Sequence, residues 1–228
     1  MIKKLIITLA VFVIPLSASA EHVAFSTGIA GMSLSKPVKS LREIRNQNVV
    51  RQRVDIGCGP ASLATILSYH FDDQTSEHDI IKFLVVEENY LEEIKKKGGF
   101  SLLDLKRYAL SKDYQAGGYR VDIKELSQLE QPAIVLLNIE KFPHFMVLKG
   151  VQGNTAYLAD PSWGNITMDL TTFSNLWQGI LLVVNKENTQ SSNLLQISSK
   201  DLVIPDAGDI KRNLGSGMIH FVANPLEF

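Results

Sequence analysis

The hydrophobic pattern of this chain changes its period near the middle, and that change limits the folds open to it. In the first half, apolar residues recur at helical spacing, as Leu63, Ile66 and Leu67 do. From Ala133 onward, short runs rich in β-branched and aromatic residues are divided by turn residues. Helices first and neighbouring strands afterwards predict an α+β fold, with an N-terminal helical half packed on a C-terminal antiparallel sheet.

Four runs are expected to be strands of this sheet: residues 133–139, 144–151, 156–159 and 180–184. The second and third runs are joined by Gly153-Asn154, a dipeptide typical of a tight β-hairpin. In a hairpin, the end of the second strand lies beside the start of the first. His144 and Asp160, at the outer ends of these two runs, are therefore predicted to come close together.

The chain has a single cysteine, Cys58, which lies where a segment expected to be extended, residues 49–52, gives way to a helical pattern. Pro60 suits the first turn of a helix, where its missing N–H costs no hydrogen bond. Thiols attack as thiolates, and a helix N-terminus stabilises that anion. Because one cysteine cannot form an internal disulfide, we interpret Cys58 as a candidate nucleophile.

Nucleophilic catalysis by a thiol needs a base and a group that orients the base. His144 is the candidate base and Asp160 the candidate orienting carboxylate. Gln52 is a candidate oxyanion donor beside the Cys58 backbone N–H.

Each of these residues also has an ordinary structural interpretation. A lone cysteine behaves as a small buried hydrophobe, and a lone histidine at a strand edge is often a satisfied core residue. An aspartate before proline is a common turn residue, and a glutamine is common in loops. The flanking Gly57 and Gly59 are interpreted as leaving room for a substrate backbone, which favours the catalytic hypothesis.

Composition and spacing argue against several other classes of protein. The charges nearly balance, with 23 Lys and Arg against 24 Asp and Glu, so no nucleic-acid partner is expected. The five histidines form no pair with the usual spacing of metal ligands, and no second cysteine exists. We therefore expect no metal and no cofactor.

The N-terminus has the pattern of a secretory signal peptide. Lys3 and Lys4 precede an apolar run over residues 5–16, and Ala-Ser-Ala at 18–20 suits a signal peptidase. The run is shorter than the ~20 residues of a comfortable transmembrane span, so a retained anchor is the alternative. Cleavage would leave a periplasmic chain that begins near Glu21 and has no integral membrane segment.

Four segments are expected along the chain: a signal peptide at 1–20, a flexible lead-in at 21–36, a peptidase domain at 37–186, and a polar linker with a C-terminal extension of unknown role at 187–228.

The candidate residues lie in three motifs that together resemble the peptidase C39 family, papain-like enzymes that cleave leader peptides after a double glycine. The motifs are Gln-x5-Cys-Gly-x-Ala-x-Leu-Ala-x-Ile-Leu at 52–67, His-Phe-x-Val-x-x-Gly at 144–150, and Leu-x-Asp-Pro at 158–161. Residues 99–108 and 164–179 are similar to the stand-alone, exported branch of that family, which includes members of functional-amyloid secretion systems.

This resemblance implies a papain-like cysteine peptidase fold and a triad of Cys58, His144 and Asp160, with Gln52 at the oxyanion. It implies a polypeptide substrate with a Gly-Gly site, and secretion or amyloid-assembly proteins as partners. Two alternatives remain open. The same residues would serve a non-proteolytic acyl transferase or amidase, and the domain would also suit an accessory protein that binds leader peptides without cleaving them.

Overall fold

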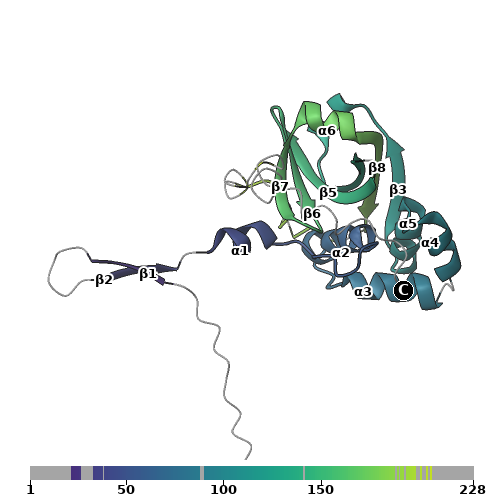
Figure 1. Ribbon diagram of the computed structural model, residues 1–228, viewed down its shortest axis with the longest axis horizontal. Coiled ribbons are helices and arrows are strands. Elements are labelled where there is room, and N and C mark those ends of the chain that lie inside the picture. The colour runs from purple at the N-terminus through teal and green to yellow at the C-terminus, as the bar shows by residue number, and fades with distance from the viewer. Residues whose placement is uncertain are drawn as a thin grey trace, which may run out of the picture. The chain divides into compact units, whose positions relative to one another are not determined.

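The computed structural model of this chain describes residues 22–26, 33–37, 39–87, 90–140, 142–187, 189, 191–192, 194–198, 201, 204 and 206. The predicted signal peptide lies outside these residues. The chain divides into two compact units, 1–40 and 41–228. In the first unit, β1 (His22–Ser26) and β2 (Ser33–Pro37) pair as an antiparallel hairpin (Figure 1). The segment predicted as a flexible lead-in therefore contains regular structure that its polar, glycine-containing sequence did not indicate.

The first half of the second unit is helical, as the hydrophobic spacing predicts: α1 (Leu41–Asn46), α2 (Cys58–His70), α3 (Glu77–Lys82), the π-helix η1 (Phe83–Glu87), α4 (Leu91–Lys97) and α5 (Leu102–Ser111). Helices α3 and α5 each begin at a capping box, formed by Ser76 with Asp79 and by Ser101 with Asp104. Among the described residues, no helix is both long and apolar enough to cross a membrane.

The predicted extended segment at 49–52 is a loop in the structure, and its hydrogen bonds explain why. The Val50 N–H donates to Thr65 Oγ1 on α2 at 3.0 Å. The Gln52 N–H donates to the Pro161 carbonyl, also at 3.0 Å. These bonds hold the segment against a helix and a turn, so it forms no ladder with a neighbouring strand.

The second half is an antiparallel sheet of six strands, and the predicted α+β layout is confirmed. Its strands run β3 (Gln115–Arg120), β4 (Ala133–Ile139), β5 (Phe142–Gln152), β6 (Thr155–Asp160), β7 (Gly164–Asp169) and β8 (Trp177–Asn185). Their order across the sheet is β3-β8-β4-β5-β6-β7. The sequence analysis missed β3 and β7. The 3-10 helix η2 (Ile123–Gln128) precedes β4, and α6 (Leu170–Leu176) precedes β8.

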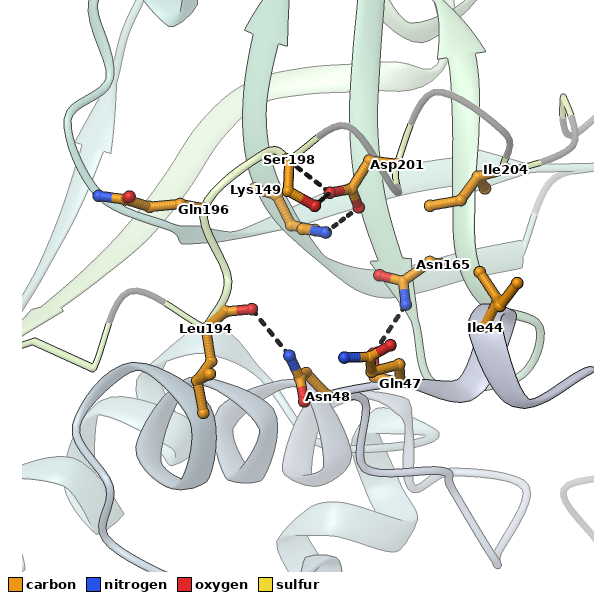
Figure 2. A pocket seen from close by; sticks show the side chains of 10 residues that line it. All are labelled: Ile44, Gln47, Asn48, Lys149, Asn165, Leu194, Gln196, Ser198, Asp201 and Ile204. Carbon is orange, nitrogen blue, oxygen red and sulfur yellow. Dashed lines mark hydrogen bonds and ion pairs between the residues drawn. The ribbon is translucent and has the colours of Figure 1, made fainter. Parts of the chain in front are cut away.

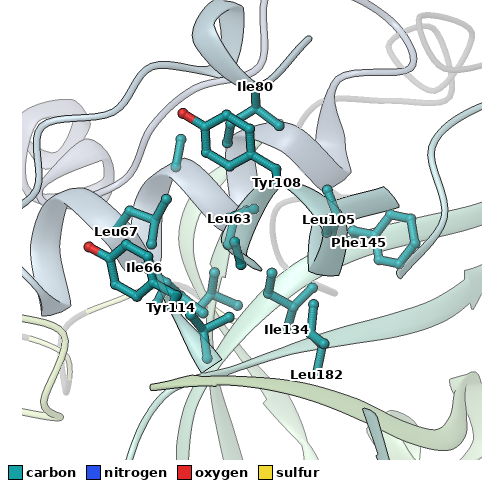
Figure 3. Packing of buried hydrophobic residues seen from close by; sticks show 14 of the residues in the cluster. Leu63, Ile66, Leu67, Ile80, Leu105, Tyr108, Tyr114, Ile134, Phe145 and Leu182 are labelled. Carbon is teal, nitrogen blue, oxygen red and sulfur yellow. The ribbon is translucent and has the colours of Figure 1, made fainter. Parts of the chain in front are cut away.

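Two hydrophobic clusters lie on the two faces of this sheet. Alternate side chains of a strand point to opposite faces, so Phe145 and Val147 join one cluster while Met146 and Leu148 join the other. The first cluster includes buried apolar residues of α2, α3, α4 and α5. Figure 3 labels members from α2, α3 and α5. The second includes Phe173 of α6. The central helix α2, buried along almost its whole length, is thereby held against the sheet.

Part of the C-terminal region packs on this domain, although the sequence analysis treated it as a linker and extension. The Ser192 N–H donates to the His70 carbonyl at 2.8 Å. Leu195 is buried in the first cluster, and Asp201 forms an ion pair with Lys149 (Figure 2). Between this segment and the domain lies a cavity of about 200 Å³. Its lining contains none of the candidate catalytic residues.

Candidate active site

Cys58 is the first residue of α2, as predicted, and its thiol is only half-buried. Gly57 occupies the N-cap position and offers no side chain to the N–H groups of the first turn. Such N–H groups have no partner within a helix, and they favour negative charge. The nucleophile candidate therefore lies beside backbone donors and is half-buried, whereas Gly57, Gly59 and Pro60 around it are buried.

The hairpin of β5 and β6 brings His144 and Asp160 together, as the sequence predicts. Ala159 pairs with Val147, so Asp160 lies one residue further toward the His144 end of β5. His144 Nε2 is 3.0 Å from Asp160 Oδ1. Both side chains are buried, with exposed fractions of 6% for His144 and 1% for Asp160. The pair thus forms in a place from which water is largely excluded.

The other ring nitrogen of His144 is not used by Asp160, and Cys58 is among the groups that interact electrostatically with this imidazole. Burial alone would lower the pKa of His144. The Asp160 carboxylate and Cys58 outweigh burial and raise that pKa to about 10. The imidazolium form is therefore favoured at neutral pH, which is the form that pairs with a thiolate.

Three donors hold the Asp160 carboxylate in place. Besides His144, the backbone N–H groups of Ser162 (2.6 Å) and Trp163 (3.2 Å) donate to Oδ1. The second oxygen, Oδ2, is buried without a hydrogen-bond partner among the described residues. Burial lowers the pKa of the Arg51 guanidinium, and attraction to Asp160 offsets part of that effect. The carboxylate is thus held on one oxygen by its own turn and lies in the field of a nearby cation.

Gln52 lies beside the same turn. Its Oε1 accepts a hydrogen bond from Ser162 Oγ at 2.8 Å. Its Nε2 faces the carbonyls of Val54 and Asp55 at 3.3 and 3.4 Å, distances near the limit for a hydrogen bond. The turn therefore links Gln52 to Asp160, while the amide donors of Gln52 make only weak bonds.

The space beside Gly57 and Gly59 is filled by neighbours within the protein. A Cβ at Gly57 would lie 1.8 Å from Glu77 Oε1, and one at Gly59 would lie 3.2 Å from the Phe145 ring and 3.5 Å from Leu105. Both positions face the protein interior. Internal packing against Glu77 and against the core therefore explains why neither position carries a side chain. That the two glycines also leave room for a substrate backbone stays a prediction.

Three residues near the site were missed by the sequence analysis. The Glu77 carboxylate accepts from the backbone N–H of Arg53 at 2.9 Å and from that of Val54 at 3.4 Å, which holds the loop before Cys58. Arg51 Nε donates to the Pro161 carbonyl at 2.9 Å, and Ser162 joins Gln52 to Asp160. For Ser162, the only sequence signal was its place directly after Asp160-Pro161. Glu77 and Arg51 carried none.

No group of three or more His, Cys, Asp or Glu in the described part of the chain could hold a metal ion. The expectation of no metal and no cofactor stays a prediction.

Comparison with known proteins gives two results from sequence. The model of the peptidase C39 family matches residues 46–189. The "probable functional amyloid protease FapD" of Pseudomonas aeruginosa is 36% identical over 182 residues, 80% of each chain. The protein of the same name from Pseudomonas fluorescens is 34% identical over 176 residues, 77% of each chain. These matches confirm the resemblance stated from the motifs.

A solved structure supports the fold. The crystal structure of the peptidase domain of Streptococcus ComA, described as a bifunctional ABC transporter involved in quorum sensing, aligns with a TM-score of 0.50. Its sequence identity is 23%, and the alignment covers 61% of this chain and 98% of that one. With the helices and antiparallel sheet described above, this likeness confirms the predicted papain-like α+β fold.

Proposed function

The chain belongs to the peptidase C39 family and is a peptidase, and from this membership we propose a cysteine endopeptidase mechanism with a Cys58, His144 and Asp160 triad. The observation that carries the proposal is the position of His144. One ring nitrogen bonds the buried Asp160 carboxylate at 3.0 Å, and Cys58 is among the groups that raise the pKa of the same imidazole. A thiol, a base and an orienting carboxylate arranged in space in that order match the requirements of nucleophilic catalysis.

In the first half of the reaction, the Cys58 thiolate attacks the carbonyl carbon of the scissile peptide bond. The new C–S bond pushes the electron pair of the carbonyl onto its oxygen. As the tetrahedral intermediate collapses, the C–N bond breaks, and the His144 imidazolium gives its proton to the leaving amine. Asp160, bonded to Nε2, keeps the opposite ring nitrogen directed at the sulfur and the leaving group.

The oxyanion forms beside the start of α2. We assign its stabilisation to the Cys58 backbone N–H and to the carboxamide of Gln52, whose two N–H bonds to carbonyls are long. Exchange of these weak bonds for a stronger, charge-assisted bond favours the transition state over the ground state.

In the second half, the neutral His144 takes a proton from a water molecule, whose oxygen attacks the thioester. The C–S bond breaks, the acid product leaves, and the thiolate and imidazolium are restored. No group beyond those in the chain and one water is needed to balance the reaction.

The proposed substrate is a secreted polypeptide cut after Gly-Gly. The preference for Gly-Gly rests on the family resemblance alone, because Gly57 and Gly59 are explained by internal packing. Two relatives bear the name functional amyloid protease, which favours amyloid-forming or amyloid-assembly proteins as substrates and partners.

A paired set of peptides tests this substrate. Peptides with Gly-Gly before the scissile bond are incubated with the enzyme, with matched peptides carrying Gly→Ala at either position. Each replacement should reduce kcat/KM at least about tenfold, since steric exclusion from a packed groove discriminates strongly. Equal cleavage of Gly-Gly and Ala-Ala peptides would contradict the specificity and leave the peptidase assignment intact.

The proposed location is the periplasm. The basic start, the apolar run over residues 5–16 and the Ala-Ser-Ala at 18–20 support export with cleavage of the signal. N-terminal sequencing of the protein recovered from a periplasmic fraction should give a chain that begins near Glu21. Recovery of the uncleaved chain from the membrane fraction would favour a retained anchor instead.

A further inference from the structure

The turn between β6 and β7 connects two parts of the site that lie far apart in sequence. Within that turn, Ser162 uses two different groups. Its backbone N–H donates to Asp160 Oδ1 at 2.6 Å, and its side-chain Oγ donates to Gln52 Oε1 at 2.8 Å. The residue therefore touches both the carboxylate that orients the base and the amide that we assign to the oxyanion.

The donors and acceptors around Gln52 determine which way its carboxamide faces. The carbonyl oxygens of Val54 and Asp55 only accept hydrogen bonds, so the NH₂ group must face them. Oε1 then faces Ser162, whose hydroxyl has to be the donor. The hydroxyl bond at 2.8 Å is shorter than both amide bonds, so Ser162 provides the firmest side-chain restraint on Gln52.

From this arrangement we infer that Ser162 is a positioning residue that holds the Gln52 carboxamide in the orientation required at the oxyanion. The inference rests on the proposed function, in which Gln52 donates to the oxyanion. A restrained amide needs no reorganisation as charge develops, whereas an unrestrained amide rotates about its terminal torsion and presents its oxygen part of the time. Ser162 acts through Gln52 and does not itself touch the reacting atoms.

The backbone of the same turn has separate anchors, which makes the side chain testable alone. The Pro161 carbonyl accepts from the Gln52 N–H at 3.0 Å and from Arg51 Nε at 2.9 Å. The Asp160 contact of Ser162 uses a backbone N–H. Ser162→Ala therefore removes the Gln52 contact and retains the bonds that hold Asp160.

A double-mutant cycle tests the inference with the full mature chain and a cleavable Gly-Gly peptide. Gln52→Ala should lower kcat by about 10²-fold with little change in KM, the usual cost of one oxyanion donor. Ser162→Ala should lower kcat by about tenfold with KM unchanged, and Ser162→Thr, which keeps the hydroxyl, should retain most of the activity. In the Gln52→Ala background, Ser162→Ala should have no further effect, because the group through which it acts is gone.

The pH profile of kcat/KM provides a second measurement. A role of Ser162 in the structure of the His144 and Asp160 pair would change this profile, whereas a role through Gln52 would not. Ser162→Ala should leave the alkaline limb of kcat/KM where it is, because His144 and Asp160 keep their contacts. A loss of kcat that is the same in both backgrounds, an unchanged kcat, or a displaced alkaline limb would each overturn the inference while the triad stands. If Gln52→Ala itself leaves kcat unchanged, the oxyanion assignment and the inference both fail.

Discussion

Strand β5 carries one member of each of two buried ion pairs. Comparing the two pairs distinguishes an ion pair proposed to act in catalysis from one that stabilises the fold. His144 near the start of β5 pairs with Asp160, which the hairpin brings from the next strand. Lys149, five residues later on the same strand, pairs with Asp201 in the C-terminal segment (Figure 2). The side chains of both pairs are at most 7% exposed.

The two pairs differ in what else their members contact. His144 also interacts with Cys58, which is half-buried and helps to raise the pKa of the imidazole. Asp201 instead accepts from the backbone N–H and the hydroxyl of Ser198 at 2.7 and 2.9 Å, within the segment that packs on the domain. Burial of an ion pair therefore does not mark a catalytic site by itself. The first pair lies beside the proposed nucleophile, and the second anchors a segment.

The largest expected contrast is in activity. His144→Ala should lower kcat/KM by at least about 10⁴-fold, since it removes the base and the partner of the thiolate. Lys149→Met, the matched control on the same strand, should leave kcat/KM unchanged at temperatures well below its melting transition. Steady-state cleavage of one peptide by the two purified variants measures the contrast, and a similar loss in both would remove the distinction between the pairs.

For the free energy of unfolding, we expect the pair of Lys149 and Asp201 to matter most. Asp201→Asn leaves the buried Lys149 ammonium without its counter-charge, so the free energy of unfolding should fall by about 3–5 kcal/mol. Replacing both partners, with Lys149→Met and Asp201→Asn together, should cost less, because no unpaired charge is then buried. Denaturant unfolding of the single and double variants tests this order. A double variant less stable than Asp201→Asn alone would contradict it.

Asp160→Asn should have an intermediate effect, with kcat/KM about 10²-fold lower because the nucleophile and base survive. Its pH dependence follows from charge. The carboxylate helps to raise the pKa of His144 to about 10, so its removal should lower that pKa and move the alkaline limb of kcat/KM to lower pH. A limb that stays in place, or moves to higher pH, would show that Asp160 does not control the protonation of His144.

Whether a feature of this domain could be predicted from the sequence depends on how far apart in the chain the residues that form it lie. The helical start at Cys58 and the hairpin that joins His144 to Asp160 are local features with turn and capping signals, and both predictions were confirmed. Strand β3 was missed, because Gly117-Gly118 and a largely exposed surface give it no alternating pattern, and its pairing with β8 defines it. Its boundaries follow from its pairing with residues 60 to 70 positions away, from Arg120 with Ile180 to Gln115 with Asn185.

Side-chain contacts between residues far apart in the chain could not be predicted from the sequence for the same reason. Ser162 contacts Gln52 across 110 positions, and Lys149 contacts Asp201 across 52. The purpose of Gly57 depends on Glu77, which fills the space beside it. The residues next to Gly57 in the sequence do not reveal this neighbour. They led only to the prediction that Gly57 leaves room for a substrate backbone, which stays a prediction.

Glu77 gives the smallest predicted effect. It is another buried carboxylate, and its bonds to the Arg53 and Val54 N–H groups hold a loop rather than a reacting group. Burial raises the pKa of Glu77 above its ordinary value of 4.5, and its backbone hydrogen bonds offset only part of that rise.

The folded state therefore binds the Glu77 proton more tightly than the unfolded state, and its contribution to stability falls as pH rises through and above 4.5. Relative to the wild type, Glu77→Gln should gain stability as the pH rises through and above 4.5, because it lacks this titration. Urea unfolding of both proteins at several pH values measures the difference. A difference that is constant with pH, or that moves the other way, would contradict the burial effect.

The most direct test of the central claim is cleavage of a Gly-Gly peptide by Cys58→Ala, measured beside the wild type with circular dichroism to verify that both are folded. If Cys58 is the nucleophile at the His144 and Asp160 pair, the variant should bind the peptide, keep its fold and show no cleavage above the uncatalysed background. A folded Cys58→Ala protein that cleaves the peptide at the wild-type rate would contradict the account.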